Sequence, residues 1–147
     1  MGHHTFDVEM ADALDDPSRY EHLSAAELVG AAALAADDRV LDVGSGTGFY
    51  TDTVAGVADR VHAVDVAVST MTYHELPAAA LDELARVVRP GGRLVVADWT
   101  ASGPGEAGPP PAERFDAWTA AAAVDDAGFT VRRAESRVET FLLTAVR

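Results

Sequence analysis

A glycine-rich turn, DVGSGTG at residues 42–48, is the stretch of the chain best suited to chemistry. Glycines permit a tight turn and let a ligand come close to the backbone. The turn follows a short apolar segment ending in Asp42 and precedes FYTDTVAGVAD, a pattern typical of a helix. In an open parallel sheet, ligands bind in the crevice at the carboxyl ends of the strands. The turn therefore predicts a ligand site at such an edge.

The spacing of the glycines distinguishes two classes of ligand. A nicotinamide-type fingerprint reads G-x-G-x-x-G, and its last position, counted from Gly44, falls on Phe49. The third glycine, Gly48, comes one residue too early for that motif. The spacing matches D-x-G-x-G-x-G instead, which disfavours a nicotinamide dehydrogenase.

Three further side chains are candidates for substrate chemistry. His74 can act as a base, orient a substrate, or simply fix its loop by hydrogen bonding. Tyr73 precedes it in the chain. Trp99 can form an apolar or cation-binding wall, or pack in the core. His74-Glu75 begins like the H-E-x-x-H motif, but residue 78 is alanine, so we predict no metal site.

The elements that would position these residues alternate in the manner of a parallel α/β sheet. We expect strands at 39–43, 60–66 and 93–99. Helices are expected before residue 37, after the glycine turn, after Pro77 and from about 112 to 127. The last two segments, FTVRRAESRV and TFLLTAVR, predict an antiparallel strand pair.

Composition excludes several kinds of function. The chain has no Cys, Lys, Asn, Gln or Ile, so disulfides, thiolate nucleophiles, a P-loop lysine and a Schiff base are ruled out. A formal net charge of -13 disfavours binding to nucleic acid or to an anionic membrane. The acidic, lysine-free composition resembles that of proteins from salt-loving organisms, although GC-rich codon usage explains it equally well. Without a membrane span or signal peptide, we expect a cytoplasmic protein.

The segment VLDVGSGTGFYT at 40–51 makes the chain resemble the Rossmann-like S-adenosylmethionine-dependent methyltransferases. LPAAALDELARVVRPGGRLVVADW at 76–99 resembles the branch that includes the ubiquinone and menaquinone C-methyltransferases, and FDVEMADALDDPSRYEHLSAAELV is similar to its N-terminal helices. The resemblance covers most of the chain. It implies a mostly parallel sheet with helices on both faces, S-adenosyl-L-methionine as the cofactor, and methyl transfer to a small-molecule acceptor.

The resemblance also implies an organisation and a set of site residues. We expect one domain, with N-terminal helices at 1–38, a cofactor-binding half at 39–66 and a substrate-side half at 67–147. In the family, an acid at the end of strand two holds the ribose hydroxyls, and Asp65 takes that place here. His74 is the catalytic candidate, and Tyr73 and Trp99 are expected in the substrate pocket. The predicted cofactor-binding residues are Asp42, Gly44, Ser45, Gly46, Gly48 and Asp65.

The chain departs from the family between Asp65 and Ala67. The family places a helix, a third strand and another helix there, whereas this chain has only Val66 before AVST at 67–70. AVST resembles the family's strand four, and Tyr73 and His74 follow it. In the family, strands two and four flank strand one, so a direct connection would span about 19 Å, but two residues reach only about 7 Å. We therefore expect the third strand and its flanking helices to be absent, through an omitted segment, a deletion or a domain swap. An inactive, methyltransferase-like binding or scaffold domain is the alternative function.

Overall fold

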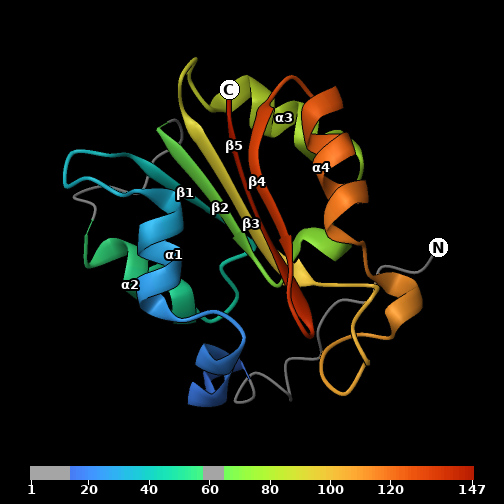
Figure 1. The fold of residues 1–147 in the computed structure, drawn as a ribbon. Helices are drawn as coiled ribbons and strands as arrows, with labels where there is room; N and C mark the ends of the chain where they lie inside the picture. Colours follow the sequence, from blue (N-terminus) through green and yellow to red (C-terminus); the bar gives the residue numbers. More distant parts are fainter. Residues whose placement is uncertain (1–13, 58–64) are drawn as a thin grey trace.

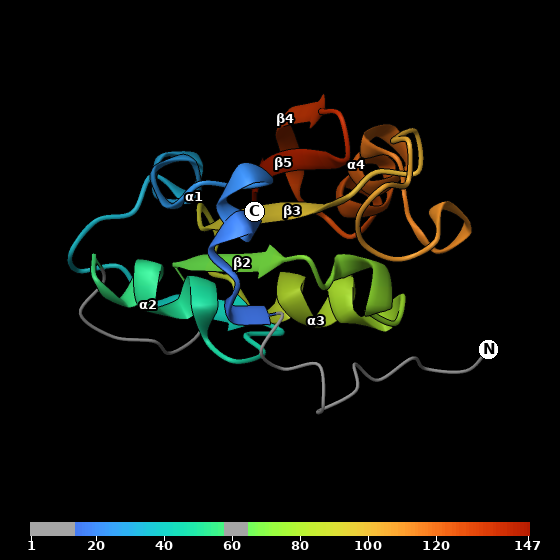
Figure 2. The same cartoon turned by 90° about the horizontal axis from the view of Figure 1, so that it is seen from below.

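The computed structural model describes residues 14–57 and 65–147, which form one mixed sheet between two helical layers (Figure 1). The strand order is β1-β2-β3-β5-β4, and Figure 2 shows the last four strands stacked in that order. Strands β1, β2 and β3 are parallel, and β5 runs antiparallel to β3 and β4. The predicted Rossmann-like sheet with a C-terminal antiparallel pair is confirmed. Its strands are β1 (Val40–Val43), β2 (Val66–Thr70), β3 (Arg93–Trp99), β4 (Thr130–Ser136) and β5 (Thr140–Val146).

Helices α1 and α2 lie on one side of the sheet, and α3 and α4 lie on the other (Figure 1). Their bounds are α1 (Ala25–Ala32), α2 (Phe49–Ala55), α3 (Ala79–Val87) and α4 (Ala117–Asp126), with 3-10 turns η2 (Pro17–Glu21), η3 (Tyr73–Glu75) and η4 (Pro111–Glu113). Ser24 and Glu27 form the capping box that starts α1. The carboxylate of Asp116 caps α4, which therefore begins later than the expected residue 112. No helix in the described ranges is long and apolar enough to cross a membrane.

The core consists of two apolar clusters, one on each face of the sheet. Alternate residues of β2 and β3 point to opposite faces, as the pleat of a strand requires. Val66, Val68 and Val95 pack with α1 and α2. Ala67 and Leu94 pack with α3 and α4. Because both faces of these strands are covered, their sequences read as nearly continuous apolar runs.

The strand predicted at 60–66 is where sequence and structure differ. Residues 60–64 lie outside the described part of the chain. Val66 begins β2, and it is paired with Val40 of β1 on one side and Arg93 of β3 on the other. Asp65 therefore directly precedes a strand, and Val66, predicted as the last residue of one strand, is the first residue of β2. The prediction of a strand ending on Asp65 falls on residues 60–64, outside the described part of the chain. All five residues of β2 are buried, so apolar burial and pairing on both edges fix where the strand starts.

The connection between β1 and β2 includes α2 and exceeds the dozen or so residues that a parallel crossover needs. The two strands are direct neighbours, and β2 contains AVST, so the segment that resembles the family's strand four lies beside strand one as expected. Within residues 14–57 and 65–147, β1 pairs with no strand other than β2. A deleted segment or a domain swap on that side of β1 stays a prediction.

Candidate active site

The glycine turn lies against the segment that follows β2. Gly44, Gly46 and Gly48 have φ angles of 73°, 56° and 95°, in the left-handed region that favours glycine. Thr72 donates a hydrogen bond from its hydroxyl to the carbonyl of Gly44, at 3.2 Å. A Cβ atom at Gly44 would lie 2.3 Å from Cγ2 of Thr72. Glycine at 44 is thus required both by the backbone conformation and by the close approach of Thr72.

A cavity of about 260 Å³ opens between this turn, the residues after β2 and the N-terminal segment. Its volume lies just below the range of about 300–1,000 Å³ that is usual for small-molecule sites. The guanidinium of Arg19 lies 5.2 Å from the ring centre of Phe49 and 5.3 Å from that of Tyr50, which places a cation at the cavity. The polar part of the lining comes from Arg19, Ser45, Thr70, Thr72 and Glu75.

Asp42, the last acid before the turn, is partly buried and contacts α2 through Thr51. Its Oδ2 accepts a hydrogen bond from the hydroxyl of Thr51 at 2.5 Å. Its Oδ1 is buried without a hydrogen-bond partner among the described residues. Burial raises the pKa of the Asp42 carboxyl above its usual value, and the bond from Thr51 opposes this. An unpaired buried oxygen is costly, so a positively charged or hydrogen-bonding group near the turn would be stabilised by it.

Asp65 is not brought to this cavity. It lies at the amino end of β2, whereas Gly44 follows the carboxyl end of the parallel neighbour β1. Its carboxylate accepts hydrogen bonds from the backbone and side chain of Arg39, each at 3.0 Å, and from the side chain of Arg89. These bonds, that of Arg89 foremost, lower the pKa of Asp65 to about 2. The structure thus gives Asp65 an ion-pair role at the opposite edge of the sheet from the glycine turn.

Replacing Asp65 with asparagine is expected to lower the free energy of unfolding by about 1 kcal/mol at neutral pH, because two ion pairs with half-exposed arginines are lost. The pKa of Asp65 is depressed in the folded state, so this stabilisation is present above the usual Asp pKa and is lost as the pH falls toward 2. Urea unfolding measures the first effect. Affinity for S-adenosylhomocysteine should change less than twofold, as it should in the charge-matched control Asp125→Asn. A tenfold weaker affinity for S-adenosylhomocysteine in Asp65→Asn alone would mean that Asp65 contributes to the cofactor site.

His74 and Asp98 form a pair between the ends of β2 and β3. Nδ1 of His74 lies 2.9 Å from Oδ1 of Asp98, and the backbone N–H of His74 donates to Oδ2 at 2.7 Å. Asp98 also accepts a hydrogen bond from the backbone of Trp99 and is completely buried. A carboxylate can only accept, so Nδ1 carries the hydrogen and Nε2 is left as the basic nitrogen of the neutral ring. The side chain of His74 is 10% exposed.

Opposing effects set the pKa of His74. Burial alone lowers it, but the hydrogen bond and the charge of Asp98, followed by the charges of Glu75 and Glu113, outweigh burial and raise it above the ordinary value. The basic nitrogen Nε2 lies 3.8 Å from a carboxylate oxygen of Glu75, a residue that lines the cavity at the glycine turn. His74 is thus an oriented imidazole of increased basicity, one residue away in the chain from that cavity.

The two residues predicted for the substrate pocket do not line the cavity at the glycine turn. Tyr73 is 7% exposed and packs edge-on against Phe115 at a centroid distance of 5.5 Å, on the side of η3 that faces α3 and α4. Trp99 lies beneath the loop after β3, since a Cβ at Gly108 would be 2.4 Å from its indole. The buried guanidinium of Arg114 lies 5.6 Å from the ring of Trp99.

Sequence reasoning missed several polar residues around the two features described above. Thr72 and Glu75 follow β2 closely, and their place at the carboxyl end of a strand was a usable signal. Asp98 lies within the strand predicted at 93–99, but its bond to His74 depends on how β2 and β3 align. Arg19 belongs to a 3-10 turn far from the glycines in the chain, and no local pattern predicts its position.

Comparisons with known proteins bear on the fold and on part of the sequence. A family model described as a methyltransferase domain matches residues 60–96. A solved structure of a SAM-dependent methyltransferase from Aquifex aeolicus has a TM-score of 0.82 and 26% sequence identity, and the match covers 96% of this chain and 98% of that chain. The chain thus has the fold of SAM-dependent methyltransferases, and part of it matches a methyltransferase domain. A comparison with curated proteins gave no match.

Two more distant methyltransferases share the fold. The N-methyltransferase NodS from Bradyrhizobium japonicum, solved with S-adenosyl-L-homocysteine, is 13% identical with a TM-score of 0.69, covering 97% of this chain and 93% of that one. The putative methyltransferase solved in complex with the Haloferax volcanii Trm112 activator is 16% identical with a TM-score of 0.66, covering 94% and 96%. The comparisons support S-adenosylmethionine as the cofactor and an enzymatic activity for this methyltransferase.

The residues at the glycine turn fit one end of that cofactor. Asp42, with its unpaired oxygen, suits the ammonium group, and Arg19 suits the carboxylate of the methionine part. A Cβ at Gly46 would meet only Leu14 within 4 Å, at 3.6 Å, whereas Thr72 fills the corresponding space at Gly44. In the described ranges, Glu75 is the acidic residue that lines the cavity, while the acid predicted to hold the ribose lies elsewhere. The cavity of about 260 Å³ is correspondingly small for the whole cofactor.

Proposed function

We propose that this methyltransferase transfers the methyl group of S-adenosylmethionine to a small-molecule acceptor, with His74 as the general base. The observation that supports the proposal most directly is the oriented His74–Asp98 pair beside a glycine-lined cavity at the carboxyl edge of the sheet. A net charge of -13 disfavours a nucleic-acid acceptor. The likeness of residues 76–99 to the quinone C-methyltransferase branch also favours a small organic acceptor.

Methyl transfer requires little covalent chemistry from the protein's own residues. S-Adenosylmethionine supplies an already activated methyl group when it is bound. Transfer is an in-line displacement, so the chain's main tasks are to align the acceptor and to exclude water. Asp42, Gly44 and Arg19 would hold the methionine end. His74 would accept a proton at Nε2 from an acceptor that must lose one, while Asp98 keeps Nδ1 protonated and stabilises the imidazolium that forms.

The proposed base has a defined pH dependence. The pKa of His74 is raised, so the imidazole is protonated over a wider range of pH and becomes able to accept a proton only above that pKa. Methyl transfer to an acceptor that loses a proton should therefore increase as the pH rises through it. His74→Gln should remove this increase without weakening the binding of S-adenosylhomocysteine.

Two measurements test the proposed function. Calorimetric titration with S-adenosylhomocysteine should show saturable binding, and its absence in the intact protein would favour the inactive binding or scaffold domain. Incubation with methyl-labelled S-adenosylmethionine and a fractionated cell extract should then place the label in the low-mass fraction. Transfer to nucleic acid or protein instead would overturn the small-molecule assignment. Boiled protein serves as the control for chemical methylation.

A further inference from the structure

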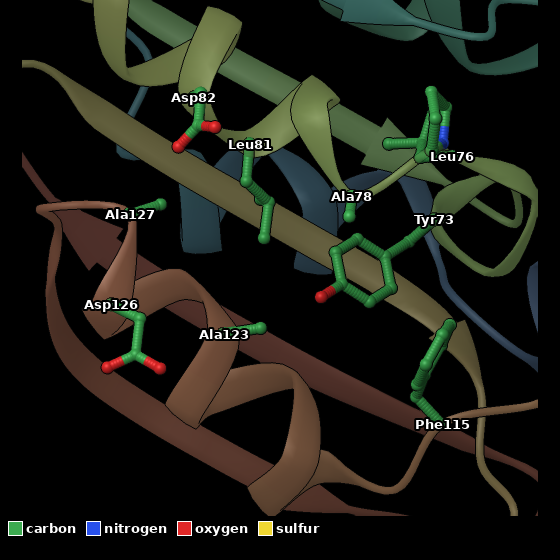
Figure 3. Close-up of a pocket in the computed structure, with 10 residues that line it drawn as sticks. Tyr73, Leu76, Ala78, Leu81, Asp82, Phe115, Ala123, Asp126 and Ala127 are labelled. Carbon is green, nitrogen blue, oxygen red and sulfur yellow. The ribbon is translucent and has the colours of Figure 1, made fainter.

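A second cavity, of about 370 Å³, lies between α3 and α4 on the face of the sheet away from α1 and α2 (Figure 3). Its volume is within the usual range for small-molecule sites. The 3-10 turn η3 separates it from the cavity at the glycine turn. Thr72 and Glu75 line the cavity at the glycine turn, whereas Tyr73 and Leu76 line the second one.

The second cavity is apolar with an acidic side. Leu76, Leu81 and Phe115 provide much of its apolar wall. Among residues 14–57 and 65–147, its charged lining residues are Asp82 at the start of α3 and Asp126 at the end of α4, both exposed carboxylates. Figure 3 shows these two acids at one end of the space and the rings of Tyr73 and Phe115 at the other. A ligand that matches this arrangement has an apolar body and one positive charge.

The hydroxyl of Tyr73 is a second, independent sign of a ligand. The residue is 7% exposed, and its side chain points into the cavity with the hydroxyl foremost (Figure 3). We find no hydrogen-bond partner for that hydroxyl among the described residues. Burial raises the pKa of Tyr73, and the charge of Asp98 adds to this, so the phenol stays neutral and can both donate and accept. The hydroxyl is not one of the fully buried polar atoms left without a partner, so it is open to the cavity and free to hydrogen-bond a polar ligand atom.

We propose that the cavity between α3 and α4 binds an apolar amine, with the ammonium group held by Asp82 and Asp126 and the body packed against Tyr73 and Phe115. Each carboxylate accepts a charge-assisted hydrogen bond from the ammonium group. The two aromatic rings, at the end away from the acids, suit the apolar or aromatic body of such a ligand. The strongly acidic chain as a whole also attracts cations. This inference is independent of the methyl-transfer reaction, because η3 lies between the two cavities.

Tryptamine, tryptophol and indole-3-propionate are suitable probes, since they share an indole body and differ in the charge of the side group. At constant ionic strength, calorimetric titration should give tryptamine a dissociation constant about tenfold lower than that of tryptophol, and indole-3-propionate should bind most weakly. Amide shift changes of tryptamine-bound protein should centre on Tyr73, Leu81 and Ala123. Equal affinities for the three probes, or no saturable binding of tryptamine, would overturn the proposal.

Variants of the lining separate a built site from general attraction to an acidic protein. Asp126→Asn should weaken tryptamine binding about threefold, as expected for an exposed carboxylate, and leave tryptophol unchanged. Asp125→Asn is the matched control, because Asp125 is the neighbouring exposed acid of α4 and does not line this cavity. Tyr73→Phe should weaken both probes several-fold while keeping the ring. An equal loss in Asp125→Asn and Asp126→Asn would reduce the effect to net charge and overturn the site.

Discussion

Gly44→Ala is expected to weaken the binding of S-adenosylhomocysteine by about a hundredfold or more and to lower the free energy of unfolding by about 3 kcal/mol. The φ angle of 73° is unfavourable for alanine. The new Cβ would also lie 2.3 Å from Cγ2 and 2.6 Å from Oγ1 of Thr72, so the turn or the segment after β2 must shift. Either shift changes the wall of the cavity. Calorimetric titration and urea unfolding measure the two effects.

Gly128→Ala is the control that separates backbone strain from the clash. Gly128 has a φ of 94°, and a Cβ there would have nothing within 4 Å. It should cost only the strain of about 1 kcal/mol and leave cofactor affinity unchanged. In a Thr72→Gly background, Gly44→Ala should fall to a similar cost, because the clashing atoms are gone. Normal affinity in Gly44→Ala would mean that the glycine turn is not the cofactor site.

Local patterns predicted most of the fold. The strand at 93–99 was predicted with the bounds that the structure gives β3. Leu81, Leu84 and Val88, which fall on one helical face, are all buried in the cluster beneath α3 and α4. Both cases depend on a periodicity contained within one element, so no knowledge of the neighbours was needed.

Asp65 shows why the start of β2 and some site contacts could not be predicted from local patterns. VHAVD reads as an apolar strand that closes on an acid, and the family places an acid at such a point. Where β2 actually begins is decided by the pairing of Val66 with Val40 and with Arg93, residues distant in the sequence. The two arginines that bind Asp65 are equally distant, at 39 and 89. Both the start of β2 and the ion pairs of Asp65 thus depend on residues distant in the sequence, which no local pattern contains.

Tyr73 and His74 illustrate the same limit within the candidate site. The sequence places both at the carboxyl end of β2, which is correct. Successive side chains of a tight 3-10 turn point in different directions, so the direction of one side chain does not predict that of the next. Tyr73 faces the cavity between α3 and α4, and His74 turns to Asp98. The grouping of these residues into one pocket was therefore not predictable from their order alone.

Asp98→Asn is expected to lower the pKa of His74 and to reduce the free energy of unfolding by about 2 kcal/mol. The carboxylate of Asp98 accepts hydrogen bonds from the backbone and ring of His74 and from the backbone of Trp99. Asparagine carries no charge and offers one acceptor oxygen, so at least one buried donor loses its partner. NMR titration of the His74 ring measures the pKa. An unchanged pKa would mean that Asp98 does not set the basicity of His74.

The pH dependence of stability gives this prediction a sign. The pKa of His74 is raised in the folded state, so its pair with Asp98 stabilises the protein fully below the ordinary histidine pKa. That contribution is lost as the pH rises through the folded-state pKa, and His74→Gln should abolish the loss.

Ser69→Ala is the control for burial alone, because it removes a buried hydroxyl without a described partner from the neighbouring strand. It should leave stability unchanged or slightly increased, since no hydrogen bond is broken. A comparable loss in Ser69→Ala would attribute the effect of Asp98→Asn to core packing rather than to the pair.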